Sequence, residues 1–169
     1  MITFTKKMVK GIIDVITSEP CKTREALQSL RVRRDGYAYI TNGFMDVRFK
    51  LQTEPIPRDD NQEEFVIPAY KLIYWYRNAK AKDYLNELSI LDLQTNEDIK
   101  QYPDIGKLFE DKIKIIPTEK VLHRFDAKLL EQFCKCAGET KIEFRATVDG
   151  AYVKSVQDEE IEAIIMEIR

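Results

Sequence analysis

Residues 6–18 read KKMVKGIIDVITS and residues 127–137 read AKLLEQFCKCA, and these two stretches decide the fold. Their apolar residues share one spacing, i, i+1, i+4, i+5 and i+8, which places them on one face of a helix. The apolar sets are Met8, Val9, Ile12, Ile13 and Ile16 in the first stretch and Leu129, Leu130, Phe133, Cys134 and Ala137 in the second. The sequence therefore predicts two helices that present equivalent apolar faces.

Each helix belongs to a longer unit, a strand, a helix and three strands, that occurs at 1–53 and again at 112–169. In the first unit, alternating residues predict strands at 2–5, 27–33, 37–41 and 44–51, with turns at Asp35-Gly36 and Asn42-Gly43. Glu19-Pro20 is expected to end the first helix. Repeated units of this kind bury their apolar faces against each other. We therefore predict one domain made of two pseudo-symmetric units.

The second unit follows the same order. Strand candidates at 113–116 and 121–124 precede the helix, which Asp126 is expected to cap and Gly138 to close. Strands are predicted at 141–148, 151–156 and 161–168, with a hairpin turn at Asp149-Gly150. Consecutive short strands joined by tight turns favour an antiparallel sheet.

Residues 54–111 are interpreted as an insertion between the two units. Here we predict a loop at 54–64, a strand at 65–67, a helix at 68–82 that begins at Pro68, a strand at 88–93 and an irregular segment at 95–111. A chain shortened from two domains of the same kind is the alternative. The insertion is preferred because the flanking units each look complete.

The composition is that of a globular protein, with 169 residues, 44% hydrophobic and 33% charged. The apolar runs are far shorter than a bilayer span, and the first residues do not resemble a signal peptide, so a cytoplasmic protein without membrane contact is expected. A net charge of −2 argues against a surface that is basic throughout. It leaves room for a local basic lining.

Catalytic motifs are missing from the sequence. It has no glycine-rich phosphate loop, no nucleophile elbow and no paired-histidine motif. Cys134 and Cys136 are spaced too closely for a usual zinc site, and His123 is the only histidine. These observations favour a binding protein with no catalytic residues, metal or cofactor over an enzyme.

Four short pieces occur in order along the chain: TNGF at 41–44, FVIPAYKL at 65–72, YPD at 102–104 and IIMEIR at 164–169. They resemble, in the same order, four segments of the bacterial DNA sliding clamps, the β subunits of the replicative polymerase. These are a Thr-Asp-Gly-aromatic turn, an apolar-Val-Ile-Pro segment before a helix, a Phe-Pro-Asp before a domain junction, and a closing strand that ends apolar-Met-Pro-Met-Arg. Asn42 and Glu167 depart from that pattern, and a bacterial clamp has three domains per chain.

The resemblance implies an α+β, DNA-clamp-like domain with an antiparallel sheet and helices on one face. Clamp helices face DNA phosphates without reading bases. The corresponding DNA-binding candidates are Lys6, Lys7, Lys10, Lys128 and Lys135, with Lys71, Arg77 and Lys82 as weaker ones. Ordinary solvated helix faces are the alternative interpretation.

Clamps also bind short peptides in an apolar cleft. By position, the cleft here would be lined by Thr41, Gly43, Phe44 and Met166. A plain hairpin turn and a core strand are the alternative explanation of these residues.

Two functions follow from the resemblance. The first is a non-enzymatic DNA-replication accessory protein, a small or phage- or mobile-element-encoded processivity factor that binds DNA and replication partners. A ring with one domain per chain would need about six copies by self-association. The second is a clamp-fold protein-binding module that does not encircle DNA and modulates partners or a host clamp. The aromatic-rich second helix, for which we count Tyr70, Tyr74, Trp75, Tyr76 and Tyr84, suggests packing, a partner surface or stacking on single-stranded bases.

Overall fold

The computed structural model describes residues 3–51, 64–86, 90, 92–93, 95, 102–112, 124–147, 150–157 and 160–167. The N-terminal part contains β1 (Phe4–Thr5), α1 (Lys6–Ile16), α2 (Glu19–Lys22), a 3₁₀ turn η1 (Glu25–Leu27), β2 (Ser29–Arg33), β3 (Tyr37–Thr41) and β4 (Met45–Lys50). The middle contains β5 (Glu64–Pro68), α3 (Ala69–Asn78), β6 (Tyr84–Leu85) and α5 (Ile105–Lys112). The C-terminal part contains α6 (Ala127–Ala137), β7 (Ile142–Thr147), β8 (Gly150–Ser155) and β9 (Ile161–Met166).

In the described part of the chain, seven strands form one antiparallel sheet in the order β5-β2-β3-β4-β9-β8-β7. The two three-stranded meanders, β2-β3-β4 and β7-β8-β9, meet at their last strands, where Val47 pairs with Ala163. Outward from the β4–β9 junction, each half of the sheet therefore contains the third, second and first strand of its meander, and β5 follows beyond β2. This mirrored order is the pseudo-symmetry that the repeated sequence pattern predicts.

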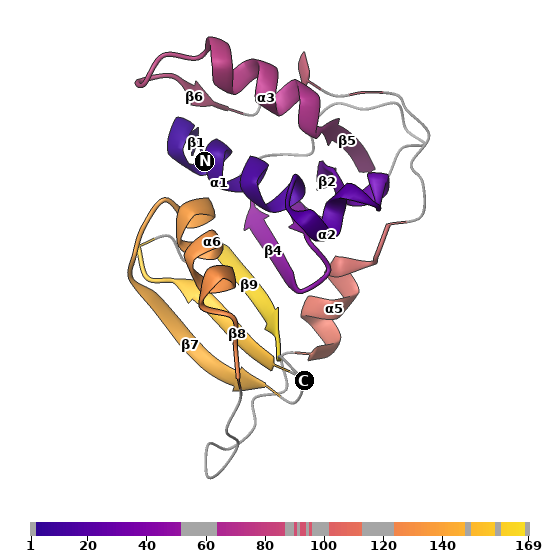
Figure 1. Cartoon of the computed structure of the whole chain (residues 1–169), viewed down its shortest axis with the longest axis vertical. Helices are drawn as coiled ribbons and strands as arrows, with labels where there is room; N and C mark the ends of the chain where they lie inside the picture. The colour runs from indigo at the N-terminus through magenta and orange to yellow at the C-terminus, as the bar shows by residue number, and fades with distance from the viewer. Residues whose placement is uncertain are drawn as a thin grey trace.

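Helices α1 and α6 lie next to each other over one face of this sheet (Figure 1). The strands turn alternate residues toward them, and Ile40, Phe49, Val153 and Ile165 are fully buried in this core together with Ile12 and Phe133 of the helices. Burial of these large side chains is the main favourable term in folding. The predicted α+β class, with two pseudo-symmetric units and their helices on one face, is confirmed.

The middle segment supplies one strand to each of two sheets in the described part of the chain, the seven-stranded sheet and a two-stranded sheet. Strand β5 pairs with the free edge of β2, with Leu30 opposite Ile67, and β6 pairs with β1, with Phe4 opposite Leu85. Helix α3 packs beside α1, and its Leu72 is fully buried in the main core. The middle segment thus shares one core with the two flanking units. The predicted boundaries at 53 and 112 remain predictions.

Two sequence predictions in the middle segment are wrong. The strand predicted at 88–93 is wrong at its described residues, because Ile90, Asp92 and Leu93 are helical and the Ile90 N–H donates to the carbonyl of Asn86 four residues earlier. In the sequence, the apolar positions 88, 90, 91 and 93 include pairs three apart, as in a helix, and pairs two apart, as in a strand, so the pattern was ambiguous. Residues 95–111 are not irregular throughout, because they include most of α5.

Other boundaries shift slightly. Helix α1 ends at Ile16, before the predicted stop, and Pro20 lies in the first turn of the separate helix α2. The predicted loop at 54–64, the strands at 113–116 and 121–124, Asp149 of the predicted turn and His123 lie wholly or largely outside the described residues. Among the residues that the structure describes, none of the helices has the length and apolar character needed to cross a bilayer.

Candidate functional site

The paired helices α1 and α6 form the first candidate surface. Thr5 caps α1 by accepting a hydrogen bond from the Met8 N–H at 3.2 Å, and Asp126 caps α6 by accepting from the Lys128 N–H at 2.9 Å. Gly138 ends α6 with φ 75°, a conformation in which glycine avoids the penalty of a side chain. The local sequence therefore determines where both helices begin and where α6 ends.

The two helices run antiparallel and approach very closely. A Cβ atom placed on Gly11 of α1 would lie 2.5 Å from the carbonyl carbon of Lys135 and 2.6 Å from the nitrogen of Cys136. Near the start of α1, the Lys7 ammonium reaches the carbonyl of Gly138, at the end of α6. This close contact joins the exposed sides of α1 and α6 into one continuous surface.

Four of the predicted lysines are exposed on this surface, namely Lys7, Lys10, Lys128 and Lys135. Lys10 forms an ion pair with Asp14, and Lys135 forms one with Glu131 at 2.7 Å. These exposed pairs contribute little to stability, but each acid offsets one positive charge. The helix pair therefore presents a modest basic surface whose strongest positions are Lys7 and Lys128.

Lys6 has a different environment from the other lysines. Its ammonium donates to the carbonyl of Ala79 at 2.5 Å and lies 4.9 Å from the ring centroid of Tyr76. Both partners belong to the C-terminal end of α3, where carbonyl groups favour a cation. Lys6 thus joins α1 to α3. Of the weaker candidates, Lys71 is half-buried on α3, while Arg77 at the end of α3 and Lys82 in the turn beyond it are exposed.

The four residues of the predicted peptide site are brought together in part. Phe44 is 55% exposed, and its carbonyl accepts a hydrogen bond from the Met166 N–H at 2.8 Å. Thr41 is buried and orders the turn by accepting from the Gly43 N–H at 2.9 Å, while Gly43 has φ 85°. Phe44 and Met166 are therefore adjacent at one end of the sheet, and the buried Thr41 stabilises the turn through its hydrogen bond with Gly43.

The Asn42 side chain connects this turn to its surroundings by hydrogen bonds. Its side-chain oxygen accepts from the backbone N–H groups of Phe44 and Met45 at 3.0 and 2.9 Å, and its amide nitrogen donates to Gln132 at 3.4 Å. Asn42 is 2% exposed, so these bonds satisfy a buried polar group. Gln132 lies on α6, and the turn is thereby connected to the helix pair.

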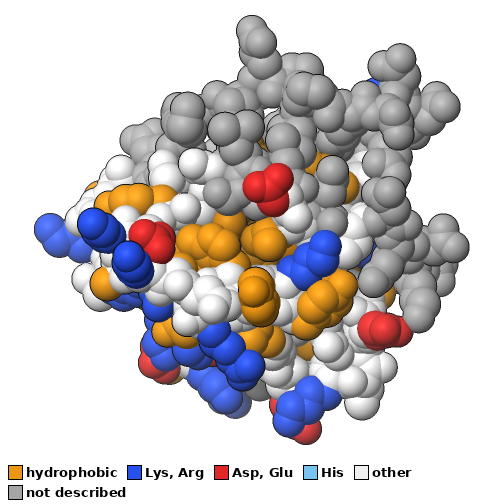
Figure 2. Space-filling model, turned by 90° about the horizontal axis from the view of Figure 1, so that it is seen from above, with side chains coloured by type: hydrophobic (Ala, Val, Ile, Leu, Met, Phe, Trp, Pro, Cys, Tyr) orange, Lys and Arg blue, Asp and Glu red, His pale blue; other side chains and the backbone are white. Residues whose placement is uncertain are grey.

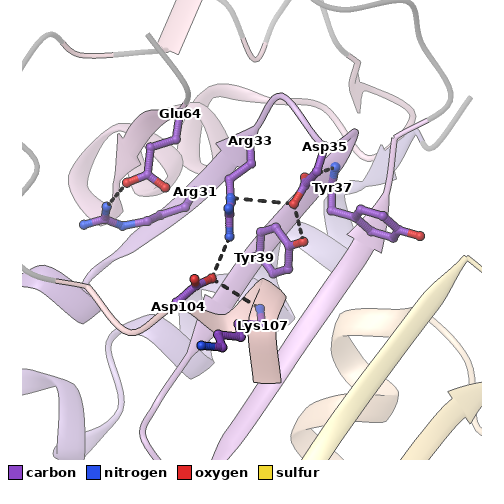
Figure 3. Close-up of polar contacts among 8 residues, drawn as sticks. All are labelled: Arg31, Arg33, Asp35, Tyr37, Tyr39, Glu64, Asp104 and Lys107. Atoms are coloured by element: carbon purple, nitrogen blue, oxygen red, sulfur yellow. Dashed lines mark hydrogen bonds and ion pairs between the residues drawn. The ribbon is translucent and has the colours of Figure 1, made fainter. Parts of the chain in front are cut away.

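The opposite face of the sheet holds a cluster that the sequence did not reveal. Helix α5 packs there through Ile105 and Phe109, which are buried against Tyr39 and Ile164. Figure 3 shows the polar contacts at its start: Arg33 donates to Asp104 at 2.8 Å and lies 3.6 Å from Asp35, which accepts from the Tyr39 hydroxyl at 2.7 Å. These residues come from β2, β3, the turn between them and the segment before α5.

Arginine–aromatic contacts complete this attachment. The Arg31 guanidinium lies 3.9 Å from the ring centroid of Tyr102 and donates to Glu64 at 2.7 Å, while Arg48 lies 4.4 Å from the ring of Phe109. Burial raises the pKa of the Tyr102 hydroxyl well above its ordinary value, so this group stays protonated. The cluster has the form of a structural attachment for α5. Its only sequence signal was the YPD piece at 102–104.

Replacing Asp104 by alanine should loosen α5. The Lys107 N–H and then the Arg33 guanidinium hold the pKa of Asp104 below its usual range. Because that pKa is lowered on folding, the carboxylate stabilises the protein above its unfolded pKa of about 3.9, and this contribution is lost as pH falls through the lower folded value. We expect a cost of about 0.5–1 kcal/mol at pH 7, since the group is exposed.

Urea unfolding of wild type and Asp104→Ala at pH 7 and pH 3 measures this effect. The difference between the two proteins should shrink at pH 3. Glu110→Ala, an exposed change on α5 itself, should cost less at pH 7. A difference that is unchanged at pH 3 would contradict the assigned role of the carboxylate.

Comparison with known proteins identifies the fold. No protein-family model matches the sequence, and none of the curated proteins matches it. Among solved structures, the Helicobacter pylori β clamp bound to a DNA ligase peptide matches with a TM-score of 0.64 and 13% identity, over 99% of this chain and 65% of the clamp chain. The Bartonella birtlesii sliding clamp bound to griselimycin gives 0.57 and 12%, over 97% and 64%. The Thermotoga maritima polymerase III β subunit gives 0.52 and 10%, over 99% and 64%.

The fold is therefore that of the bacterial sliding clamps, as the four sequence pieces indicated. The chain spans slightly less than two thirds of the length of the clamps that it matches.

Proposed function

We propose that this chain is a non-enzymatic DNA-replication accessory protein that contacts the DNA backbone without sequence specificity and docks replication partners. The observation that carries the proposal is the pairing of α1 and α6 on one face of a clamp-like sheet, with exposed lysines along the pair. Lysines on a helix surface attract phosphates and release counterions without contacting base edges. Such a surface suits a protein that must move along DNA.

Clamp-like structures also suggest how partners dock. The Helicobacter pylori clamp is known in complex with a DNA ligase peptide. In this chain, the adjacent Phe44 and Met166 at the end of the sheet offer the corresponding apolar contact for a short peptide. We therefore propose that partners bind beside the turn at 41–44, against the exposed side chain of Phe44, which is not part of the core.

A test of this function uses DNA topology. If copies of this chain close around DNA, the protein should be retained on nicked circular DNA and lost when the same DNA is linearised. The measurement is co-elution of protein and DNA on gel filtration at about 0.15 M salt. At this concentration, salt screens the attraction between exposed lysines and phosphates, so a contact that depends on this attraction alone is weak. Light scattering on the free protein gives the number of copies under the same conditions.

The second candidate is a clamp-fold binding module that does not encircle DNA. The ion pairs that offset Lys10 and Lys135 favour it, because they reduce the charge of the helix surface. Equal retention on circular and linear DNA, together with a monomer or dimer in solution, would contradict encirclement. That result would leave the peptide-docking end of the sheet as the main functional surface.

A further inference from the structure

The exposed side of α3 and β6 carries three tyrosines. Tyr70 is 58% exposed, Tyr74 is 70% exposed and Tyr84 is 56% exposed. They are three of the six large hydrophobic side chains that are exposed among the described residues, so this hairpin-like segment is unusual for the molecule. Tyr70 and Tyr74 are four residues apart on α3 and are therefore neighbours on one face of the helix. Figure 2, which looks down on α3 and β6, shows hydrophobic side chains gathered there.

The core does not require these three rings. Helix α3 is fixed from its other side by buried Ala69 and Leu72, and Ile73, Trp75 and Tyr76 pack against the same core. Tyr84 follows the alternation of β6, in which its neighbour Leu85 is fully buried. The tyrosines are thus displayed outward by elements whose packing is already complete.

Positive charge accompanies the tyrosines. Arg77, Lys80 and Lys82 are exposed at the end of α3 and in the turn before β6, and none of them forms an ion pair with another described residue. The single acid in residues 70–86 is Asp83, whose carboxylate accepts from the Lys80 backbone N–H. Figure 2 shows Lys and Arg side chains around the hydrophobic group, among them those at its left end.

We propose that this tyrosine–lysine face, Tyr70, Tyr74 and Tyr84 with Arg77, Lys80 and Lys82, binds single-stranded nucleic acid. Exposed aromatic rings stack on unpaired bases, and flanking cations hold the phosphates, without a requirement for sequence. A duplex offers no free base faces to such rings. The excess of positive charge matches a polyanion. The residues of this face lie on α3, β6 and the turn between them rather than on α1 or α6, so the inference does not depend on duplex binding to the α1–α6 surface.

Substitutions at the tyrosines test this binding with a fluorescent oligo(dT) probe. Tyr70→Leu, Tyr74→Leu and Tyr84→Leu keep apolar bulk but remove the aromatic ring, and each should weaken oligo(dT) binding roughly tenfold. The matching Tyr→Phe variants keep the ring and should bind like wild type. Phe144→Leu removes an exposed ring from β7, outside this face, and should leave the affinity unchanged. All the altered side chains are exposed, so far-UV circular dichroism should stay the same.

Two further measurements separate this surface from the helix pair. Reversing Arg77, Lys80 and Lys82 to glutamate should weaken oligo(dT) binding and flatten its salt dependence, whereas Lys7→Glu with Lys128→Glu should change it by less than about twofold. Duplex DNA should compete poorly with the oligo(dT) probe. Leucine variants that bind as well as wild type, or duplex that competes as well as oligo(dT), would overturn the proposal and indicate a protein-docking face or a general charge effect.

Discussion

Replacing Gly11 by alanine should lower the free energy of unfolding by about 2–3 kcal/mol. In an isolated helix the same change would raise helix stability by about 1 kcal/mol, because alanine is the better helix former. The sign is reversed here because the added Cβ would lie 2.5 Å from the backbone of Lys135 on α6. Backbone atoms cannot move aside as a flexible side chain can, so the whole helix pair has to separate.

Urea unfolding measures this effect. Lys10→Ala, one residue earlier on the exposed side of α1, is the matched control and should change stability by no more than about 0.5 kcal/mol. A Gly11→Ala protein that is more stable than wild type would show that α1 and α6 do not approach each other as closely as described. The close approach also brings the lysine-bearing surfaces of α1 and α6 together, and this arrangement exists only in the folded protein. The variant should therefore weaken DNA binding in proportion to its loss of folded protein.

Reversing Lys7 and Lys128 to glutamate should weaken binding to duplex DNA by about 10- to 100-fold at low salt, if the α1–α6 surface faces DNA. These two lysines are chosen because neither forms an ion pair with a described acid, whereas Lys10 and Lys135 do. If each contacts one phosphate, the slope of log K against log salt should become less steep by about 2. Fluorescence anisotropy with a labelled duplex at four salt concentrations provides both numbers.

Lys50→Glu with Lys107→Glu is the matched control. It makes the same change in net charge, and both side chains are exposed away from the α1–α6 surface, at the end of β4 and on α5. The control should retain nearly the wild-type salt slope, because a change in net charge alone acts weakly over distances beyond a Debye length. If both double variants lose affinity equally, DNA contact cannot be assigned to the helix pair.

Local patterns were sufficient to predict the helix and the three-stranded meander of each unit. The 3.6-residue periodicity at 127–137, with Asp126 and Gly138 at its ends, matches α6, and the alternation at 37–41 matches β3. The turns at Gly36 and Gly43 were signalled by their neighbours Asp35 and Asn42. Such features succeed because caps, turns and alternating burial are set by residues close together in the chain.

The surroundings of the candidate site residues could be predicted only in part, and the reason is again physical. The sequence identified exposed lysines on α1 and α6 but placed Lys6 among them, and its ammonium instead contacts Tyr76 and Ala79. That contact joins residues more than seventy positions apart, which no local pattern records. The adjacency of Phe44 and Met166 was suggested by the family resemblance alone.

The sequence by itself determined two amphipathic helices, their caps, the meanders and a resemblance to sliding clamps, because each of these depends on short-range spacing or short motifs. Only the tertiary structure decided that β4 meets β9, that Gly11 allows α1 to touch α6, and that α5 is attached to the far side of the sheet. Helix α5 escaped notice because contacts with distant strands hold it: its Ile105 and Phe109 are buried against Tyr39 and Ile164, and Arg33 pairs with Asp104 just before the helix. A short helix is marginal alone, and packing against the rest of the chain makes it form.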